Sequence, residues 1–357
     1  MPLSFGAIMH TRSCSFFTRS AGAALALSSL FFGGCGGSAP NRFIGDPGSD
    51  MGTRVDLAMT APDMAQPEDM AQPGQGSYYR YAMNNFTLPQ TRTQLAIDLN
   101  GDGRLDNQLG NIIGVLASQG LSAQTTVDQS VARGDVVELL RLRTADATLT
   151  NDNPVPVVAY AGKPMANPDF SGAGSFTVDN GVPAAPLNGT LAAAAYASED
   201  PITTTKPVTL QLKLPLFAGG APVPMILNGA HIQFTTSGAQ GGLMAGQING
   251  SIKDSDVQGL IVPAIAVTLT AQIQKDPNSA QSKQLESLFD TGGCGAAKAN
   301  DGIVDACEVA TNPIIMAVLA PDVQIYDNLG AYAPNKTNMM KDSLSVSIGF
   351  TAVRAQF

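Results

Sequence analysis

The chain has 357 residues, enough for one large domain or two small ones, and its 44% of apolar residues is ordinary for a protein with a core of its own. Its net charge is −9, and removal of residues 1–34 would leave 18 basic and 29 acidic side chains, a net of −11. A surface this negative repels phosphate backbones, which argues against nucleic-acid binding and favours cations or basic partners.

The N-terminal segment has the organisation of an export signal. Arg12 and Arg19 precede an apolar run at 21–32, and a Gly-Gly pair follows directly before Cys35. A positive region, a short apolar region and a small-residue cleavage site are the three parts of a signal peptide. The run is too short to span a bilayer as a helix. The sequence therefore predicts a signal peptide over 1–34.

The cysteine that follows the small pair gives this cleavage site a second property. The pattern resembles the lipobox of bacterial lipoproteins, in which the cysteine is acylated and becomes the mature N-terminus. This resemblance implies a membrane anchor through lipid on Cys35; secretion after a different cleavage is the alternative. Gly36 follows the cysteine, and in Gram-negative lipoproteins a residue other than Asp there goes with outer-membrane sorting. The implied location is the outer membrane, on its periplasmic or cell-surface face.

Residues 35–76 are dominated by Gly, Pro, Ala, Met, Gln and acids, with a near-repeat in 62–66 and 68–73. Such a composition lacks the apolar periodicity that builds a core. We predict that this segment is a solvated, disordered tether between the lipid and the folded part.

Residues 77–145 are predicted to form a small mixed α/β unit. The segment 78–99 has the pattern of extended chain, and 136–142 returns to strand. Between them, four apolar residues at helical spacing predict an amphipathic helix that ends near Gly120, and a second short helix around 127–131 stops at Gly134. The four residues of the stripe are Leu109, Ile112, Ile113 and Leu116.

The strongest chemical motif lies inside this unit, in the pattern DxNxDGxxD. Oxygen-bearing side chains at positions 1, 3, 5 and 9, a backbone carbonyl at position 7 and a glycine at position 6 are what a calcium loop requires. The predicted ligands are Asp98, Asn100, Asp102, the carbonyl of Arg104, and Asp106.

Over about nine residues this loop resembles those of EF-hand, dockerin, thrombospondin type 3 and integrin-type propeller repeats. Leu109 occupies position 12, where an EF-hand has its bidentate glutamate. The predicted site therefore binds Ca²⁺ statically and does not switch. The alternative is an acidic turn that needs no metal.

Residues 146–357 are rich in Gly, Pro, Thr and Asn, with short alternating runs that predict a β-sandwich or barrel-like body with a few packed helices. The fold class is accordingly mainly β with α. Apolar residues alternate at 210–216, at 232–234 and at 344–350. His231 shares its side of a strand with Gln233, which indicates an ordinary surface histidine rather than a catalytic base.

One further helix is expected where Ser255 and Gln258 have the spacing of a capping box. Pro263 should kink this helix. Its apolar stretch, 259–273, has the length of a core helix rather than of a membrane-spanning one.

Two cysteines remain in the body, and in an exported protein Cys294 and Cys307 predict a disulfide that closes a loop of about 14 residues. Two free thiols are the alternative. Within the loop, Asp301, Asp305 and Glu308 match positions 5, 9 and 12 of an EF-hand, which gives a weaker Ca²⁺ prediction because positions 1 and 3 are alanines. The competing interpretation is a disulfide-stapled acidic loop without metal.

Enzyme signals are sparse, because HExxH, GxSxG, P-loop and CxxC motifs are all absent and only one histidine follows the leader. Three hypotheses remain: a structural or interaction module, an envelope lipid- or glycan-binding protein, and a hydrolase that uses unrecognised carboxylates. The chain as a whole resembles the uncharacterised surface lipoproteins of Gram-negative bacteria. That resemblance implies a location and no activity.

Overall fold

The computed structural model describes residues 76–118, 122–179, 184–215, 222–292, 294, 298–334 and 340–357. These residues belong to one compact unit, Pro67–Phe357. The predicted signal peptide, Cys35 and the tether as far as residue 75 lie outside the described residues, as does Leu216.

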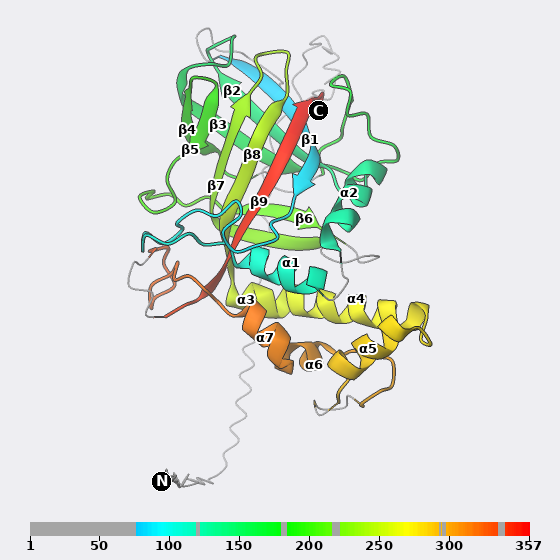
Figure 1. Ribbon diagram of the computed structural model, residues 1–357. Coiled ribbons are helices and arrows are strands. Elements are labelled where there is room, and N and C mark those ends of the chain that lie inside the picture. The colour runs from blue at the N-terminus through cyan, green and yellow to red at the C-terminus, as the bar shows by residue number, and fades with distance from the viewer. Residues whose placement is uncertain are drawn as a thin grey trace, which may run out of the picture. The chain divides into compact units, whose positions relative to one another are not determined.

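A nine-stranded antiparallel sheet forms the body of this unit and confirms the predicted mainly β fold with helices (Figure 1). The strand order is β5-β4-β3-β2-β1-β9-β8-β7-β6. The strands are β1 (Ser77–Thr87), β2 (Glu138–Thr144), β3 (Asp152–Ala161), β4 (Leu187–Ala192), β5 (Ala195–Ser198), β6 (Leu210–Leu214), β7 (Val223–Thr236), β8 (Leu243–Lys253) and β9 (Ser343–Arg354).

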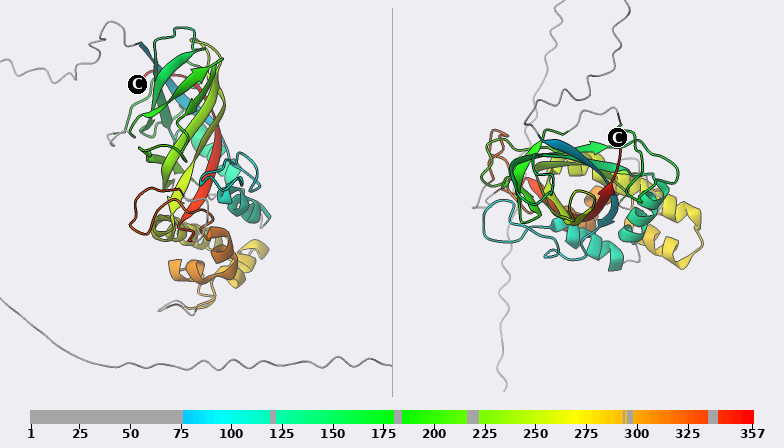
Figure 2. Two further views of the ribbon diagram at one scale, coloured as in Figure 1. Left: turned by 90° about the vertical axis from the view of Figure 1, so that its left-hand side faces the viewer. Right: turned by 90° about the horizontal axis from the view of Figure 1, so that it is seen from above.

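The sheet closes on itself because β7 divides one edge between two partners. Its first half, Val223–Leu227, pairs with β6, and its later residues, Gln233–Thr235, pair with β5. The second pairing joins the two ends of an eight-strand ring, which is seen from above in Figure 2. The body is therefore barrel-like.

The predicted units 77–145 and 146–357 share this sheet. β1 pairs with β2 on one side and with β9 on the other, and β2 pairs with β3. The hydrogen-bonded sheet therefore contains strands from both sides of residue 145.

Aromatic and aliphatic side chains fill the interior of the ring. The rings of Tyr196 and Phe234 stack with centroids 4.7 Å apart, and Phe350 meets Phe234 edge-on at 6.5 Å. On β9 the predicted alternation is present: Leu344, Val346 and Ile348 belong to this core. Period-2 alternation sends the serines between them to the opposite face. That face is also buried.

Helices gather at one end of the barrel, with α2 along its side (Figures 1 and 2). The four-residue stripe of the first predicted helix is buried as expected, and the second helix ends at Gly134, whose φ of 77° only glycine adopts easily. The helices are α1 (Gln108–Ser118), α2 (Ala123–Arg133), α3 (Asp254–Asp256), α4 (Val262–Lys275), α5 (Ala280–Phe289), α6 (Ala306–Thr311) and α7 (Pro313–Leu319), with a π-helical turn η1 (Val257–Ile261) between α3 and α4.

The long helical segment Asp254–Lys275 corrects one local prediction. Helix α3 begins at Asp254, directly after β8, with Lys253 as its N-cap and no side-chain cap, so the capping box at Ser255 is wrong. The strand ends without an intervening turn, and its last residue therefore fixes the helix start. By length and composition this segment could cross a membrane. Its buried residues, including Ile265 and Leu269, belong to the main core, as the prediction of a core helix requires.

Candidate metal centre

The loop at 98–106 folds around the carboxylate of Asp98. The backbone N–H groups of Gly101 and Gly103 donate to its two oxygens at 2.6 and 2.8 Å. Both glycines have φ near +80°, a conformation that other residues rarely adopt. A backbone hydrogen bond from Asp106 to Ile97, of 2.8 Å, closes the base of the loop. The glycines of the motif are therefore required by the turn itself.

Three of the predicted ligands come together. Asp98, Asp102 and Asp106 each present a carboxylate oxygen, and these three oxygens lie within 4.8 Å of one another. Ligands of one calcium ion stand 2.3–2.6 Å from it, so two of them are at most about 5 Å apart. The spacing of the aspartates fits one such cation.

The electrostatics of the cluster favour a cation in its midst. Asp106 is almost wholly buried, and this burial raises its pKa to about 7, with further increases from the negative charges of Asp322, Asp102 and Asp98. Three neighbouring carboxylates repel one another, and a divalent cation between them would replace that repulsion with attraction.

The two remaining predicted ligands have supporting roles in the loop. Asn100 is buried, and its side-chain oxygen accepts from the N–H of Asp102 at 3.2 Å. The N–H of Arg104 donates to Asp102 at 2.8 Å, and the Arg104 side chain is exposed. The carbonyl of Arg104, rather than its cationic side chain, remains the predicted ligand.

The loop is built into the body of the protein. Leu99 is buried with Val323 and Ile325 in a small core of its own, and its N–H donates to Asp106 at 3.1 Å. Immediately after the loop, the Asn107 side chain accepts from the N–H of Ser347 at 3.1 Å, and the N–H of Gln108 donates to the Ser345 hydroxyl at 2.7 Å. The acidic loop therefore docks on the serine face of β9.

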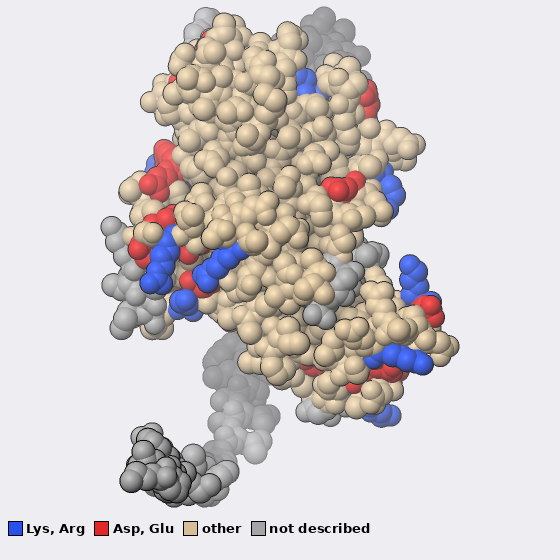
Figure 3. Space-filling view, in the orientation of Figure 1, with Lys and Arg blue, Asp and Glu red and all other residues tan. Residues whose placement is uncertain are grey.

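A second segment completes this cover. Asp322 accepts from both the N–H and the hydroxyl of Ser345, at 2.8 and 2.6 Å, and forms an ion pair with Arg92 at 3.1 Å. Charged side chains lie together where the loops 89–107 and 320–334 run, whereas much of the strand surface in the same view carries few (Figure 3). The polar face of β9 is buried because these two loops cover it.

The second predicted loop is stapled as expected, since Cys294 and Cys307 form a disulfide. Its acids, however, bond to the backbone. Asp305 and Glu308 form the capping box of α6, and Glu308 also accepts from Gly292. Asp301 accepts from the N–H of Ile303 at 3.0 Å. Among the described residues, the acids that come together as a potential metal centre are those of the first loop and not Asp301, Asp305 and Glu308.

His231 corrects another prediction, because it is buried and not on the surface. Its Nδ1 lies 3.1 Å from the Glu199 carbonyl and 2.8 Å from the Ser198 hydroxyl. The Ser198 hydroxyl also accepts from the N–H of Ile232 at 3.0 Å. These contacts tie the end of β5 to β7.

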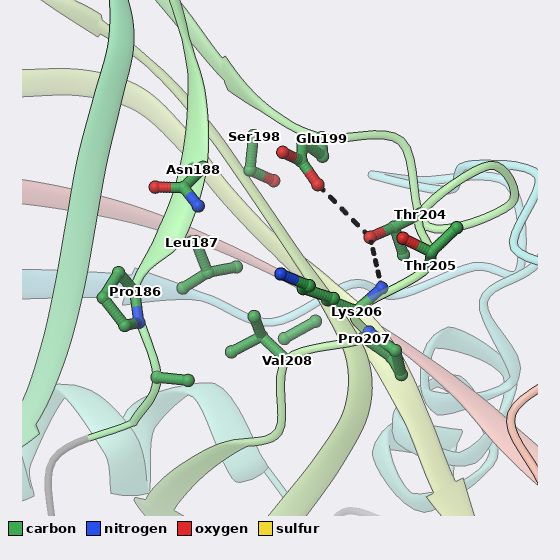
Figure 4. Close-up of a pocket in the computed structure, with 12 residues that line it drawn as sticks. Pro186, Leu187, Asn188, Ser198, Glu199, Thr204, Thr205, Lys206, Pro207 and Val208 are labelled. Carbon is green, nitrogen blue, oxygen red and sulfur yellow. Dashed lines mark hydrogen bonds between the residues drawn. The ribbon is translucent and has the colours of Figure 1, made fainter.

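Ser198 also borders a pocket of about 480 Å³ (Figure 4). Across this pocket the carboxylate of Glu199 accepts from the Thr204 hydroxyl at 3.2 Å, which in turn accepts from the N–H of Lys206 at 3.2 Å. These bonds fold the 199–206 loop against β5 and explain the burial of His231, which the alternation of β7 alone does not indicate.

Comparison with protein-family models, with curated proteins and with solved structures finds no match for this chain.

Proposed function

We propose that this chain is an exported protein, anchored to the outer membrane by lipid on Cys35, whose body is stabilised by Ca²⁺ at 98–106 and serves as a structural or interaction module. The export signal and the position of Cys35 support the location. The three converging aspartates support the ion. The negative surface favours cations or basic partners over nucleic acids.

The observation that carries the calcium assignment is the convergence of Asp98, Asp102 and Asp106, whose carboxylate oxygens lie within 4.8 Å of one another. Oxygen-only ligands suit a hard cation such as Ca²⁺, and extracellular calcium is plentiful enough to fill a weak site permanently. Leu109, at the position of an EF-hand glutamate, is buried in the main core. The helix after the loop is thus fixed, and the ion acts as a brace rather than a switch.

A structural or interaction role is supported by the packing of the described helices against the sheet, which leaves little room for a lipid between them. An apolar cavity between α1, α4 and the sheet measures about 20 Å³. That volume is close to the space that one water molecule requires, and far from that of an acyl chain. The lining residues of this cavity include Leu109, Ile265 and Leu344.

Calcium binding is tested on the full chain, purified in detergent, by calorimetric titration and by thermal unfolding with Ca²⁺ or with EGTA. An ion that binds only the folded state at about 100 times its Kd adds roughly 2.7 kcal/mol to the free energy of unfolding. For a body of this size we expect a rise in Tm on the order of 5 °C.

The chain offers a closely matched control. Asp102 and Asp169 each accept one backbone N–H from the residue two positions later, at 2.8 Å, but only Asp102 belongs to the cluster. Asp102→Asn should abolish the calcium-dependent rise in Tm, and Asp169→Asn should retain it. An equal Tm in Ca²⁺ and EGTA for the unaltered protein would refute the calcium assignment.

The anchor is tested separately by expression in a Gram-negative host with an alkyne-labelled fatty acid. The unaltered chain and Cys14→Ser should incorporate the label, and Cys35→Ser should not. Label that persists in Cys35→Ser, or its absence from the unaltered chain, contradicts the lipid anchor.

A further inference from the structure

A cleft opens where the barrel wall is incomplete. β5 pairs only with the later part of β7, whereas β6 pairs with its first half. Two cavities of about 630 and 550 Å³ lie along β6 and share Ala161, Gln211 and Lys213 among their lining residues. We call the two cavities together the β3–β6 cleft. Each has the size of a small-molecule site.

The basic side chains that line the cleft are matched by acids. The ammonium of Lys213 lies 3.4 Å from Asp179, and the guanidinium of Arg133 lies 2.8 Å from Asp135. An anionic or cationic ligand would have to compete with one of these pairs. The cleft is therefore electrostatically suited to a ligand without net charge.

One deeply buried polar group also borders the cleft. Glu138 is 2% exposed, and one of its oxygens accepts from the N–H of Lys213 at 2.9 Å. Burial raises the pKa of this carboxyl to about 8. A neutral carboxylic acid both donates and accepts hydrogen bonds, as a hydroxyl-rich partner requires.

The other lining groups combine hydrogen bonding with flat apolar surface. Gln211 is exposed on the wall common to both cavities and offers an amide. Tyr160, Pro207 and Pro224 are also among the lining residues, and the guanidinium of Arg141 lies 5.3 Å from the centre of the Tyr160 ring. Amide groups next to aromatic and pyrrolidine rings suit the alternating polar edges and apolar faces of sugar rings.

We infer that the β3–β6 cleft binds a neutral oligosaccharide, with the amide of Gln211 and the carboxyl of Glu138 as hydrogen-bonding partners and Tyr160 as an apolar wall. This site is independent of the metal centre, since none of its lining residues belongs to the 98–106 loop. It gives the body a ligand class in addition to a structural role.

The test measures binding of defined hexasaccharides to the full chain in detergent, by calorimetry and by saturation-transfer NMR. The neutral probes are the hexamers of glucose with α-1,4, β-1,4 and β-1,3 linkage and of β-1,4-linked N-acetylglucosamine; the anionic probe is hexagalacturonate. We expect at least one neutral hexamer to bind with a Kd of about 1 mM or tighter. Its affinity should persist in about 1 M NaCl, where the Debye length is about 3 Å.

Substitution of the exposed Gln211 locates the site without disturbing the core. Gln211→Ala should weaken binding about tenfold, the effect of one lost hydrogen bond, and Gln211→Trp should abolish it by filling the cleft. Gln281→Ala, on the exposed surface of α5, is the control and should leave the affinity unchanged.

Two results would overturn the inference. One is that no neutral hexamer binds at about 10 mM, or that only hexagalacturonate binds and does so in a salt-sensitive manner. The other is binding that both Gln211 variants leave unchanged. Gln211→Ala decides the matter if Gln211→Trp fails to fold.

Discussion

Glu138 makes the stability of the protein depend on pH in a way that can be measured directly. The side chain is buried, and its only described hydrogen bond comes from the N–H of Lys213 on β6. Burial raises its pKa from an ordinary value of 4.5 to about 8 in the folded state. Glu138→Gln retains the shape and the acceptor oxygen but cannot ionise.

The direction of this pH dependence follows from the number of protons that each state binds. Between pH 4.5 and 8 the folded state holds this proton and the unfolded state does not, so the free energy of unfolding falls as the pH rises. The contribution is fully present below pH 4.5 and is lost as the pH rises through about 8. The slope is about 1.4 kcal/mol per pH unit, which gives a total on the order of 5 kcal/mol.

The assay is urea unfolding at several pH values from about 5 to about 9, in saturating Ca²⁺, for the unaltered chain and for Glu138→Gln. The difference between the two isolates Glu138, because the other titrating groups are common to both. We expect the variant to gain relative stability steadily as the pH rises. Glu286→Gln, on α5, controls for the loss of a carboxyl group outside the barrel.

A stability difference between Glu138→Gln and the unaltered chain that stays constant across this pH range would refute the reasoning. It would mean that Glu138 ionises in the folded protein as readily as in the unfolded chain. The surroundings of Glu138, beside Lys213 of β6, would then be hydrated rather than dry.

Three further predictions follow from features of the fold. Replacing both Cys294 and Cys307 by Ala should lower the free energy of unfolding by about 3 kcal/mol, measured in urea, and an unchanged midpoint would contradict a constraining role for the disulfide. Leu99→Ala should lower the free energy of unfolding by about 2 to 4 kcal/mol, because Leu99 fills the small core with Val323 and Ile325. It should also weaken Ca²⁺ binding in a calorimetric titration. A loss of stability with unaltered affinity would show that this core does not support the 98–106 loop. Burial lowers the pKa of His231, so its contribution to stability is present above its ordinary pKa of 6.5 and is lost as the pH falls below it; an NMR titration of the ring in the mature chain that gives a pKa at or above 6.5 would contradict this burial.

Local patterns in the sequence predict most of the elements that the structure contains. The stripe from Leu109 to Leu116 forms one face of α1, and the alternation at 344–350 forms β9. The acidic loop at 98–106 is also a local pattern, because a turn of nine residues brings its own aspartates together. The disulfide is predictable because Cys294 and Cys307 are the two cysteines that follow Cys35 in the sequence.

Features that depend on distant segments are not visible in any such pattern. His231 has the alternation with Gln233 that is typical of a surface residue, but the 199–206 loop covers it. The residues next to His231 in the sequence do not predict that contact. The serines of β9 likewise have the pattern of an exposed face, yet the loops that contain Asn107 and Asp322 bury them.

The β3–β6 cleft is a further feature of this kind. Glu138 belongs to no local sequence motif. Its hydrogen-bond partner Lys213 lies 75 residues later in the sequence, on β6. The cleft lies where β5 and β6 pair with different parts of β7. A local sequence pattern cannot predict such a cleft, because the cleft depends on which strands pair with one another.

The pairing of β1 with β9 sets the order in which the protein can be completed. The first strand of the body hydrogen-bonds to the last, and the last also separates β1 from β8. A chain made from its N-terminus exposes the edges of β1 and β8 until its final residues emerge, and contacts so remote in sequence form slowly. Chaperones that shield open strand edges would therefore act on this protein until β9 has been made, and removal of β9 would leave both β1 and β8 without a partner on one side.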